Sequence, residues 1–130
     1  MSIRLLEAGE AERIRVGINN DREFKLVGRD MTLNLVIDVG GEQRLFKLRD
    51  GEVRTIGQLV PMAESVDVYI KGAREFWKHL LSPVPPTRFQ NLYAAVHAGN
   101  CEITGNHELY NAYFAAINRM IDLLRELQNN

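Results

Sequence analysis

The sequence predicts one α+β domain in which a five-stranded, mostly antiparallel meander sheet carries helices packed on one face. Apolar and polar residues alternate between residues 31 and 72, as they do in strands with one buried face. On both sides of this region apolar residues recur every three or four positions, as they do in amphipathic helices. The chain contains no internal repeat, low-complexity tract or linker, so a single domain spanning residues 1–130 is expected.

The first 29 residues are predicted to be a helical amino-terminal extension of a core that spans residues 30–128. An apolar stripe recurs at helical spacing through this extension, although glycines interrupt it. A break at Asn19, Asn20 and Asp21 precedes residues 22–27, where it offers caps for a second short helix. Phe24 and Leu26 alternate in that segment and also suit a strand, so the residues leave both alternatives open.

Four predicted strands follow one another and are separated by turn signals. Gly40-Gly41 and Asp50-Gly51 supply the positive-φ positions of tight hairpins. These four strands are residues 31–39, 42–50, 52–60 and 65–72. A short fifth strand, which carries Cys101 and Ile103 on its inward face, is expected just before Gly105.

The carboxyl-terminal half is mainly helical. Apolar spacing predicts helices over residues 73–81 and 89–98, and the prolines between residues 83 and 86 form a rigid connector between them. From Asn106 onward the last helix is apolar over two adjacent stripes. Its polar residues occupy the narrower remaining face. A helix this apolar requires another element, a partner or a ligand to cover it.

The composition excludes several classes of function. The formal net charge is minus one and the two signs are interspersed, which gives no electrostatic signature of binding to nucleic acid or to an anionic membrane surface. The one cysteine, Cys101, cannot form an internal disulfide, and no Cys/His cluster has the spacing of a metal site. No apolar run resembles a signal peptide or a membrane span. We therefore expect a cytoplasmic protein without a metal, a cofactor or stable membrane insertion.

The order of these elements and one short motif resemble the sterol carrier protein type 2 family. The motif is the Cys-Glu-Ile-Thr-Gly-Asn strand and turn of residues 101–106, which leads into the terminal helix. The resemblance covers about residues 30–128 and implies a sheet and helices that enclose an apolar tunnel for sterols, fatty acids or acyl-CoA, with no catalytic residues. The amino-terminal extension resembles bacterial members, and the chain lacks a Ser-Lys-Leu-like ending.

A ligand cavity is predicted between the sheet and the helices, because aromatic and apolar residues gather on the inferred inward faces. The predicted ligand-binding residues are Phe76, Trp77, Leu80, Phe89, Leu92, Tyr93, Val96, Ile103, Tyr110, Tyr113, Phe114, Ile117 and Ile121. The hydroxyls of Tyr110 and Tyr113 are candidates to hold a polar group of the ligand, and a bond to a backbone carbonyl is the alternative. Cys101 is expected to act as a small buried hydrophobe. The histidines at positions 79, 97 and 107 are expected at helix ends or in solvent.

Three functions follow, of which non-catalytic binding or transfer of an apolar ligand is favoured. The second is an accessory module whose terminal helix packs on a partner enzyme or in a homodimer. The third is a small isomerase or cyclase that uses Asp38 or Asp67 as a base and a tyrosine as an oxyanion donor. The order of elements disfavours the third, because such enzymes place most strands after the helices, whereas the longest helix here comes last.

Overall fold

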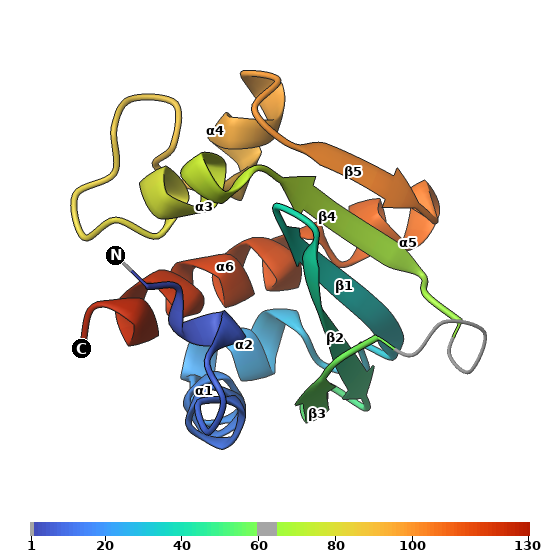
Figure 1. The fold of residues 1–130 in the computed structure, drawn as a ribbon. Helices are drawn as coiled ribbons and strands as arrows, with labels where there is room; N and C mark the ends of the chain where they lie inside the picture. The colour runs from blue at the N-terminus through green and yellow to red at the C-terminus, as the bar shows by residue number, and fades with distance from the viewer. Residues whose placement is uncertain (1, 60–64) are drawn as a thin grey trace.

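Five strands form a mixed sheet in the computed structural model, which describes residues 2–59 and 65–130. Their order across the sheet is β3-β2-β1-β4-β5 (Figure 1). The strands are β1 (Leu33–Val39), β2 (Glu42–Arg49), β3 (Glu52–Gly57), β4 (Val68–Gly72) and β5 (Glu102–Gly105). Among these described strands, the pairing of β1 with β4 is parallel and the other three are antiparallel. The predicted five-stranded, mostly antiparallel sheet is confirmed.

The first three strands form the predicted meander. Gly40 and Gly41 turn the chain between β1 and β2 with φ values of 57° and 100°, and Asp50 and Gly51 do the same between β2 and β3. The fourth strand does not extend the meander, because β4 pairs with β1 instead of with β3. It also begins at Val68, later than predicted, and the predicted end of the third strand at Val60 lies outside the described residues.

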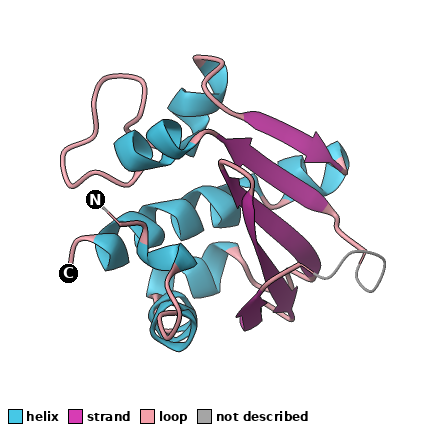
Figure 2. Cartoon of the chain, in the orientation of Figure 1, coloured by secondary structure: helices cyan, strands magenta, loops and turns pink. Residues whose placement is uncertain are grey.

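The helices cover one face of the sheet (Figure 2). They are α1 (Ala11–Asn19), α2 (Arg22–Val27), α3 (Arg74–Leu80), α4 (Leu92–His97), α5 (His107–Ala112) and α6 (Phe114–Gln128). The ambiguous segment at residues 22–27 is helical. The side chain of Asp21 accepts a hydrogen bond from the Phe24 N–H at 2.9 Å and caps this helix, while Phe24 is buried and Leu26 points outward.

The predicted terminal helix is interrupted at Tyr113. Its backbone has φ −111° and ψ 21°, which ends α5 and begins α6 in a new direction. The bonds from Tyr113 N–H to Leu109 C=O and from Ile117 N–H to Tyr113 C=O persist, each at 3.0 Å. The break therefore leaves these two helical bonds in place, and it lets α5 contact β4 while α6 contacts α1 and α2. No proline or glycine signals this change of direction in the sequence.

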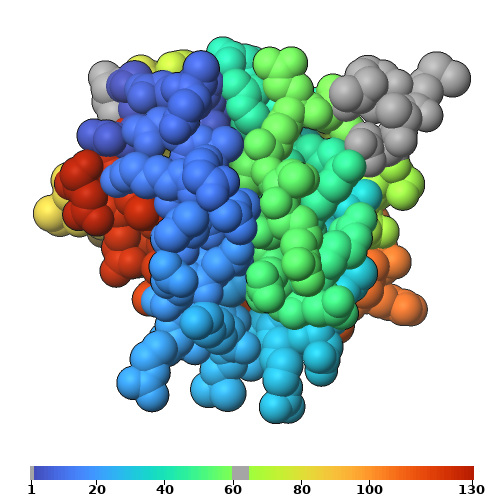
Figure 3. Space-filling view, turned by 90° about the horizontal axis from the view of Figure 1, so that it is seen from below, coloured from blue at the N-terminus to red at the C-terminus, as the bar shows by residue number. Residues whose placement is uncertain are grey.

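One apolar core joins the sheet to the helices. Leu35, Phe46 and Ile70 face it from the sheet, and Trp77 is fully buried in it from α3. Residues before position 30 belong to the same core, since Ile14, Ile18 and Phe24 are buried in it. Figure 3 shows the amino-terminal helices lying beside the hairpin of β2 and β3 on the molecular surface. The predicted extension thus contributes to the core, and the division of the chain at residue 30 stays a prediction.

The central strand β1 is buried along its whole length, although the described helices cover only one face of the sheet. The polar side chains of β1 that point away from the helices are paired by hydrogen bonds. Asn34 donates to the Ser65 carbonyl at 2.6 Å and accepts from Arg49 at 2.9 Å. Asp38 accepts from the Gly41 N–H at 2.8 Å and from the Gln43 amide at 3.0 Å. These neighbours satisfy polar groups whose burial would otherwise destabilise the strand.

Candidate functional site

A mainly apolar cavity of about 300 Å³ lies between α4 and the junction of α5 with α6. Its lining consists of Tyr93, Val96 and His97 from α4, Tyr110 and Asn111 from α5, and Phe114 from α6. These residues include no Asp, Glu, Lys or Arg. An apolar lining with a few uncharged polar groups is typical of sites for small apolar ligands, whose volumes begin at about 300 Å³.

Three aromatic rings form the main wall of this cavity. The ring of Phe114 lies edge-on to that of Tyr110, with centroids 5.5 Å apart, and edge-on to that of Tyr93, with centroids 5.8 Å apart. The ring of Tyr93 also lies against that of His97, with centroids 4.2 Å apart. Edge-to-face geometry is the favoured arrangement of aromatic pairs. Tyr110 is almost fully buried, whereas Tyr93 is 54% exposed, so the cavity runs from a buried phenol to an exposed one.

The turn before α5 sets the position of Tyr110. Gly105 has φ 102°, and a Cβ atom built on it would lie 2.3 Å from the Asp67 carbonyl oxygen, so only glycine fits there. The next residue, Asn106, donates its N–H to the same carbonyl at 2.6 Å and caps α5 by accepting from the Leu109 N–H at 3.1 Å. The Thr-Gly-Asn sequence therefore fixes where α5 starts and where Tyr110 points.

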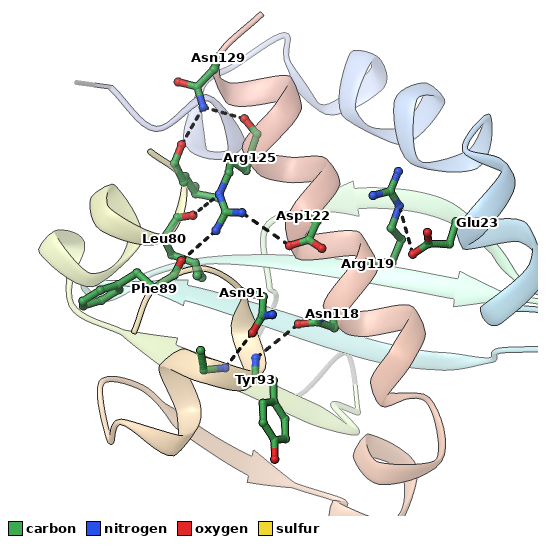
Figure 4. Close-up of polar contacts among 12 residues, drawn as sticks. Glu23, Leu80, Phe89, Asn91, Tyr93, Asn118, Arg119, Asp122, Arg125 and Asn129 are labelled. Atoms are coloured by element: carbon green, nitrogen blue, oxygen red, sulfur yellow. Dashed lines mark hydrogen bonds and ion pairs between the residues drawn. The ribbon is translucent and has the colours of Figure 1, made fainter. Parts of the chain in front are cut away.

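The first turn of α4 is tied to α6. The side chain of Asn91 caps α4 by accepting from the Ala94 N–H at 2.8 Å. The Asn118 side chain of α6 accepts from the Tyr93 N–H at 3.4 Å, as Figure 4 shows. Both contacts use backbone donors that a helix leaves unpaired at its amino end. The wall formed by Tyr93, Val96 and His97 is thereby held against Phe114.

Burial keeps the inner end of the site neutral. It raises the pKa of the Tyr110 phenol to about 12, with a smaller contribution from the neighbouring Cys101. Burial also raises the pKa of the Cys101 thiol to about 11. Both groups are therefore protonated at neutral pH. The buried phenol can donate or accept a hydrogen bond without introducing charge.

Solved structures of similar fold were found by comparison. A sterol carrier protein 2 matches with a TM-score of 0.70 at 16% identity, over 88% of this chain and 92% of that chain. A conserved hypothetical protein from Thermus thermophilus, described as possibly a sterol carrier protein, matches with a TM-score of 0.73 at 16% identity, over 96% of this chain and 90% of its own. The chain has the sterol carrier protein 2 fold. The resemblance predicted from the sequence is confirmed for the architecture.

A third structure with this fold is named UbiJ-SCP2 Ubiquinone synthesis protein. It matches with a TM-score of 0.58 at 16% identity, over 90% of this chain and 93% of that chain. No protein-family model and no curated protein matches the sequence. The sterol carrier fold is thus shared with proteins whose sequences differ widely from this one.

The sterol carrier fold brings part of the predicted site together. Tyr93, Val96, Tyr110 and Phe114 line the cavity. Ile103 and Tyr113 are half-buried at the edge of the core, and Phe89 contacts the rings of Phe76 and His79. The remaining predicted residues lie inside the core and are at most 5% exposed: Phe76, Trp77, Leu80, Leu92, Ile117 and Ile121.

Trp77 shows why these core positions do not line the cavity. Its indole N–H donates to the Asp38 carbonyl oxygen at 2.9 Å, and its ring packs edge-on against Phe76 with centroids 5.1 Å apart. The indole therefore fills the space between α3 and the sheet, where the sequence predicted a ligand. Helical spacing separates inward from outward residues. It does not show which inward residues pack against other residues and so leave no space for a ligand.

Two cavity residues were not predicted from the sequence. His97 was expected at a helix end or in solvent, and it is the exposed last residue of α4; Asn111 was expected on the polar face of the last helix. Both residues also line the cavity. His97 lies four residues after Tyr93, so the two share one face of α4. That spacing is the sequence signal by which His97 can be found. Asn111 carries no comparable signal, because its position depends on the break at Tyr113.

A row of polar side chains along α6 faces α3, α4 and the loop between them (Figure 4). Arg125 donates to the Leu80 carbonyl at 2.8 Å and to the Phe89 carbonyl at 3.0 Å. Asn129 donates to the Leu81 carbonyl at 2.8 Å. The sequence places Arg125 on the polar face of the last helix, and the structure shows that Arg125 and Asn129 hold the loop between α3 and α4 against α6.

The carboxylates considered as catalytic bases lie elsewhere. Asp38 is occupied by the two hydrogen bonds described above, and Asp67 accepts from the Asn34 N–H at 2.7 Å. Neither residue lines the cavity. Within residues 2–59 and 65–130, no three His, Cys, Asp or Glu side chains are grouped as metal ligands. No helix in the same ranges is long and apolar enough to cross a bilayer.

A larger hollow of about 470 Å³ lies between the end of α1, α2 and the turn of β2 and β3. Its lining is mostly charged or polar: Arg15, Val16, Asn19, Asn20, Lys25, Arg29, Asp50, Gly51 and Glu52. Asn19 there exchanges two hydrogen bonds with the backbone of Val53, at 2.8 and 3.0 Å. This hollow joins α1 to the sheet edge and does not suit an apolar ligand.

Proposed function

We propose that the protein binds an apolar, uncharged ligand of the lipid class, without converting it chemically, in the cavity between α4 and the α5–α6 junction. The observation that carries this proposal is the lining, which is rich in aromatic rings and free of charged side chains. The sterol carrier fold supports it, because one structure with this fold is named sterol carrier protein 2. Sterols, fatty acids and acyl-CoA are the ligand classes that the sequence resemblance implies.

The polar groups in the cavity favour a hydroxyl or carbonyl group over a carboxylate. The lining offers the Tyr110 phenol at the inner end and the Asn111 amide and His97 imidazole nearer the surface. All three can exchange hydrogen bonds with a neutral oxygen. No arginine or lysine lines the cavity to balance a carboxylate, which is costly to bury unpaired. A sterol therefore fits the inner end better than an ionised fatty acid.

A binding experiment with two fluorescent probes tests this proposal. Dehydroergosterol represents the sterols, and cis-parinaric acid represents the fatty acids. We expect saturable binding of dehydroergosterol, with weaker binding of the carboxylate probe at neutral pH. Organic extraction of the purified protein followed by mass spectrometry provides an independent measurement, since a bound neutral lipid would copurify.

Phe114→Ser and Tyr113→Ser form a matched pair of variants. Both residues are half-buried aromatics at the α5–α6 junction, but only Phe114 lines the cavity. We expect Phe114→Ser to weaken dehydroergosterol binding by at least about tenfold and Tyr113→Ser to leave it within about twofold. Equal binding by wild type and Phe114→Ser would overturn the proposal. An obligate oligomer without lipid in native mass spectra would instead favour the accessory module.

A further inference from the structure

The phenol of Tyr110 is buried at the inner end of the cavity and lacks a hydrogen-bond partner in the described part of the chain. Tyr110 is 8% exposed and belongs to the cavity lining. No hydrogen bond joins its hydroxyl to any of residues 2–59 and 65–130. Buried hydroxyl groups are normally paired, because an unpaired one costs free energy. A hydroxyl or carbonyl group of a ligand in the cavity would supply the missing partner.

The other polar side chains of the lining lie near water. Tyr93 is 54% exposed, and His97 and Asn111 are also exposed. Water can satisfy their hydrogen bonds whether or not a ligand is bound, so a polar group of the ligand adds little at this end. The inner end is therefore the place where a ligand oxygen satisfies a buried protein group.

Side chains of the core limit the depth of the cavity. All six lining residues come from helices. Leu92, Ile117 and Ile121, which the sequence predicted to line a longer tunnel, are fully buried in the core. Trp77 occupies the space between α3 and the sheet. Among the described residues, the cavity therefore ends near Tyr110 and does not continue beneath the sheet.

The volume of the cavity sets how much of a ligand it encloses. A water molecule takes about 30 Å³ in the liquid and a methylene group takes a similar volume, so a cavity of about 300 Å³ holds about ten non-hydrogen atoms. A primary alcohol of medium chain length fits such a space in full. A sterol is more than twice this size, so only its hydroxyl-bearing end fits, and the rest lies outside the mouth at Tyr93.

The two orientations of such a ligand differ in one hydrogen bond. If the apolar end enters first, the Tyr110 phenol loses contact with water and gains no partner, which costs free energy. If the polar end enters first, the phenol and the ligand oxygen satisfy each other. In both cases a chain of the same length contacts Val96 and Phe114, so apolar burial does not favour either orientation. The hydrogen bond to Tyr110 decides between them.

We propose that the cavity is a short site, closed at Tyr110, that takes the hydroxyl- or carbonyl-bearing end of a neutral lipid first, encloses about ten non-hydrogen atoms and leaves any longer chain outside Tyr93. Neutral fatty alcohols of medium chain length are the class that fits in full. This inference rests on the proposed function, because it concerns the same site, and it adds the orientation and the enclosed length of the ligand.

A series of primary alcohols from hexanol to tetradecanol tests the length limit on the wild-type chain, by displacement of bound dehydroergosterol. We expect affinity to rise about fourfold with each added methylene up to about decanol, and by less than about 1.5-fold per methylene beyond it. If dehydroergosterol binds but the rise continues unchanged to tetradecanol, or no alcohol displaces it, the inference is overturned and the proposed function stands. Absence of dehydroergosterol binding would overturn both.

Two tyrosines of the lining form a matched pair for the orientation. Tyr110→Phe removes the inner phenol, and Tyr93→Phe removes the phenol at the mouth. Neither hydroxyl is hydrogen-bonded to another described residue, so both substitutions should leave the fold intact. Octanol and chlorooctane, which have similar shapes, are compared as ligands of each protein.

We expect the preference for octanol over chlorooctane to fall about fivefold in Tyr110→Phe and to change by less than about twofold in Tyr93→Phe. The desolvation of each ligand is the same for all three proteins, so the change in preference reports the hydrogen bond alone. A loss of preference in Tyr93→Phe instead would place the ligand hydroxyl at the mouth and overturn the inference. The same preference in all three proteins would overturn it as well.

Discussion

Asp21 accepts two hydrogen bonds from the Arg119 guanidinium, at 2.8 and 2.9 Å, and so joins the start of α2 to the middle of α6. Residues 98 positions apart are held together by this pair. Asp21 also caps α2, and Arg119 lies 3.7 Å from Glu23. The hydrogen bonds from Arg119 lower the pKa of Asp21, and those same bonds raise the pKa of Arg119. One carboxylate thus stabilises both a helix end and the contact between the two ends of the chain.

Replacement of Asp21 separates these two contributions. Asp21→Ala removes the cap and the ion pair, and we expect it to lower the free energy of unfolding by about 1 to 2 kcal/mol. Asp21→Asn retains a capping oxygen and loses the charge, so it should cost less. Urea denaturation measures both values. Equal stability of Asp21→Ala and wild type would contradict the role assigned to this pair.

The pH dependence of the same contact follows from the lowered pKa of Asp21. A carboxylate whose folded pKa is depressed stabilises the fold fully above its unfolded pKa, ordinarily about 3.9. That stabilisation is lost as the pH falls below this value and through the lower folded pKa. The stabilities of wild type and Asp21→Asn should therefore converge as the pH falls from about 4 through the folded pKa of Asp21, since protonation removes the charge of Asp21 and the Asn side chain carries none.

Much of the architecture could be predicted from local pattern. The alternation around Leu35 and Ile37 and the Gly40-Gly41 turn predict two paired strands, and both form because local spacing decides which face is buried. The glycine at position 105 was also part of the motif that indicated the fold, and the structure shows a close contact there that excludes a side chain. Such features depend on neighbouring residues and are therefore visible in sequence.

The rest depends on contacts between distant residues. The parallel pairing of β4 with β1 leaves no signature in the turn residues, and the break at Tyr113 contains neither glycine nor proline. The predicted site is only partly assembled for the same reason. Trp77 has the spacing of a cavity residue, but its indole N–H donates to the carbonyl of Asp38, which belongs to strand β1. Sequence spacing gives the face of a helix, whereas tertiary packing determines which residues on that face leave space.

Trp77→Phe should destabilise the fold without affecting the cavity. The substitution leaves the Asp38 carbonyl without the indole donor and removes buried volume, for which we expect a loss of about 2 to 3 kcal/mol. Thermal unfolding followed by circular dichroism measures this loss. Dehydroergosterol affinity at a temperature where the variant is folded should remain near the wild-type value. A large loss of affinity without a loss of stability would place Trp77 in the binding site instead.

Asp122 is expected to destabilise the fold at neutral pH. Its Oδ1 atom is buried without a hydrogen-bond partner and lies 3.8 Å from the Arg125 Nη1. Burial raises the pKa of Asp122, while Arg125 and Arg119 oppose the shift and Glu126 and Glu23 add to it. Because the folded pKa exceeds the unfolded one, stability falls as the pH rises from the unfolded value through the folded value.

Asp122→Asn tests this assignment. The amide removes the buried charge, so the variant should be more stable than wild type at pH 7, by about 1 kcal/mol. Below the ordinary carboxyl pKa of about 3.9 the difference should disappear, because Asp122 is then protonated in both states. Chemical denaturation at both pH values measures the two differences. A less stable variant at pH 7 would show that the ion pair with Arg125 outweighs the cost of burial.

The thiol of Cys101 is expected to react slowly in the folded protein. Its pKa of about 11 leaves little thiolate at neutral pH, and the thiolate is the reactive form. Alkylation by iodoacetamide at pH 7 should be at least about a hundredfold slower than in guanidinium chloride, where the pKa returns to about 8.5. Mass spectrometry of the labelled protein measures both rates.

Tyr110→Phe is the control, because it keeps the burial of Cys101 and removes only the neighbouring phenol. The Cys101 thiol of this variant should react equally slowly. A folded thiol that reacts as fast as the unfolded one would contradict the raised pKa that burial gives to Cys101.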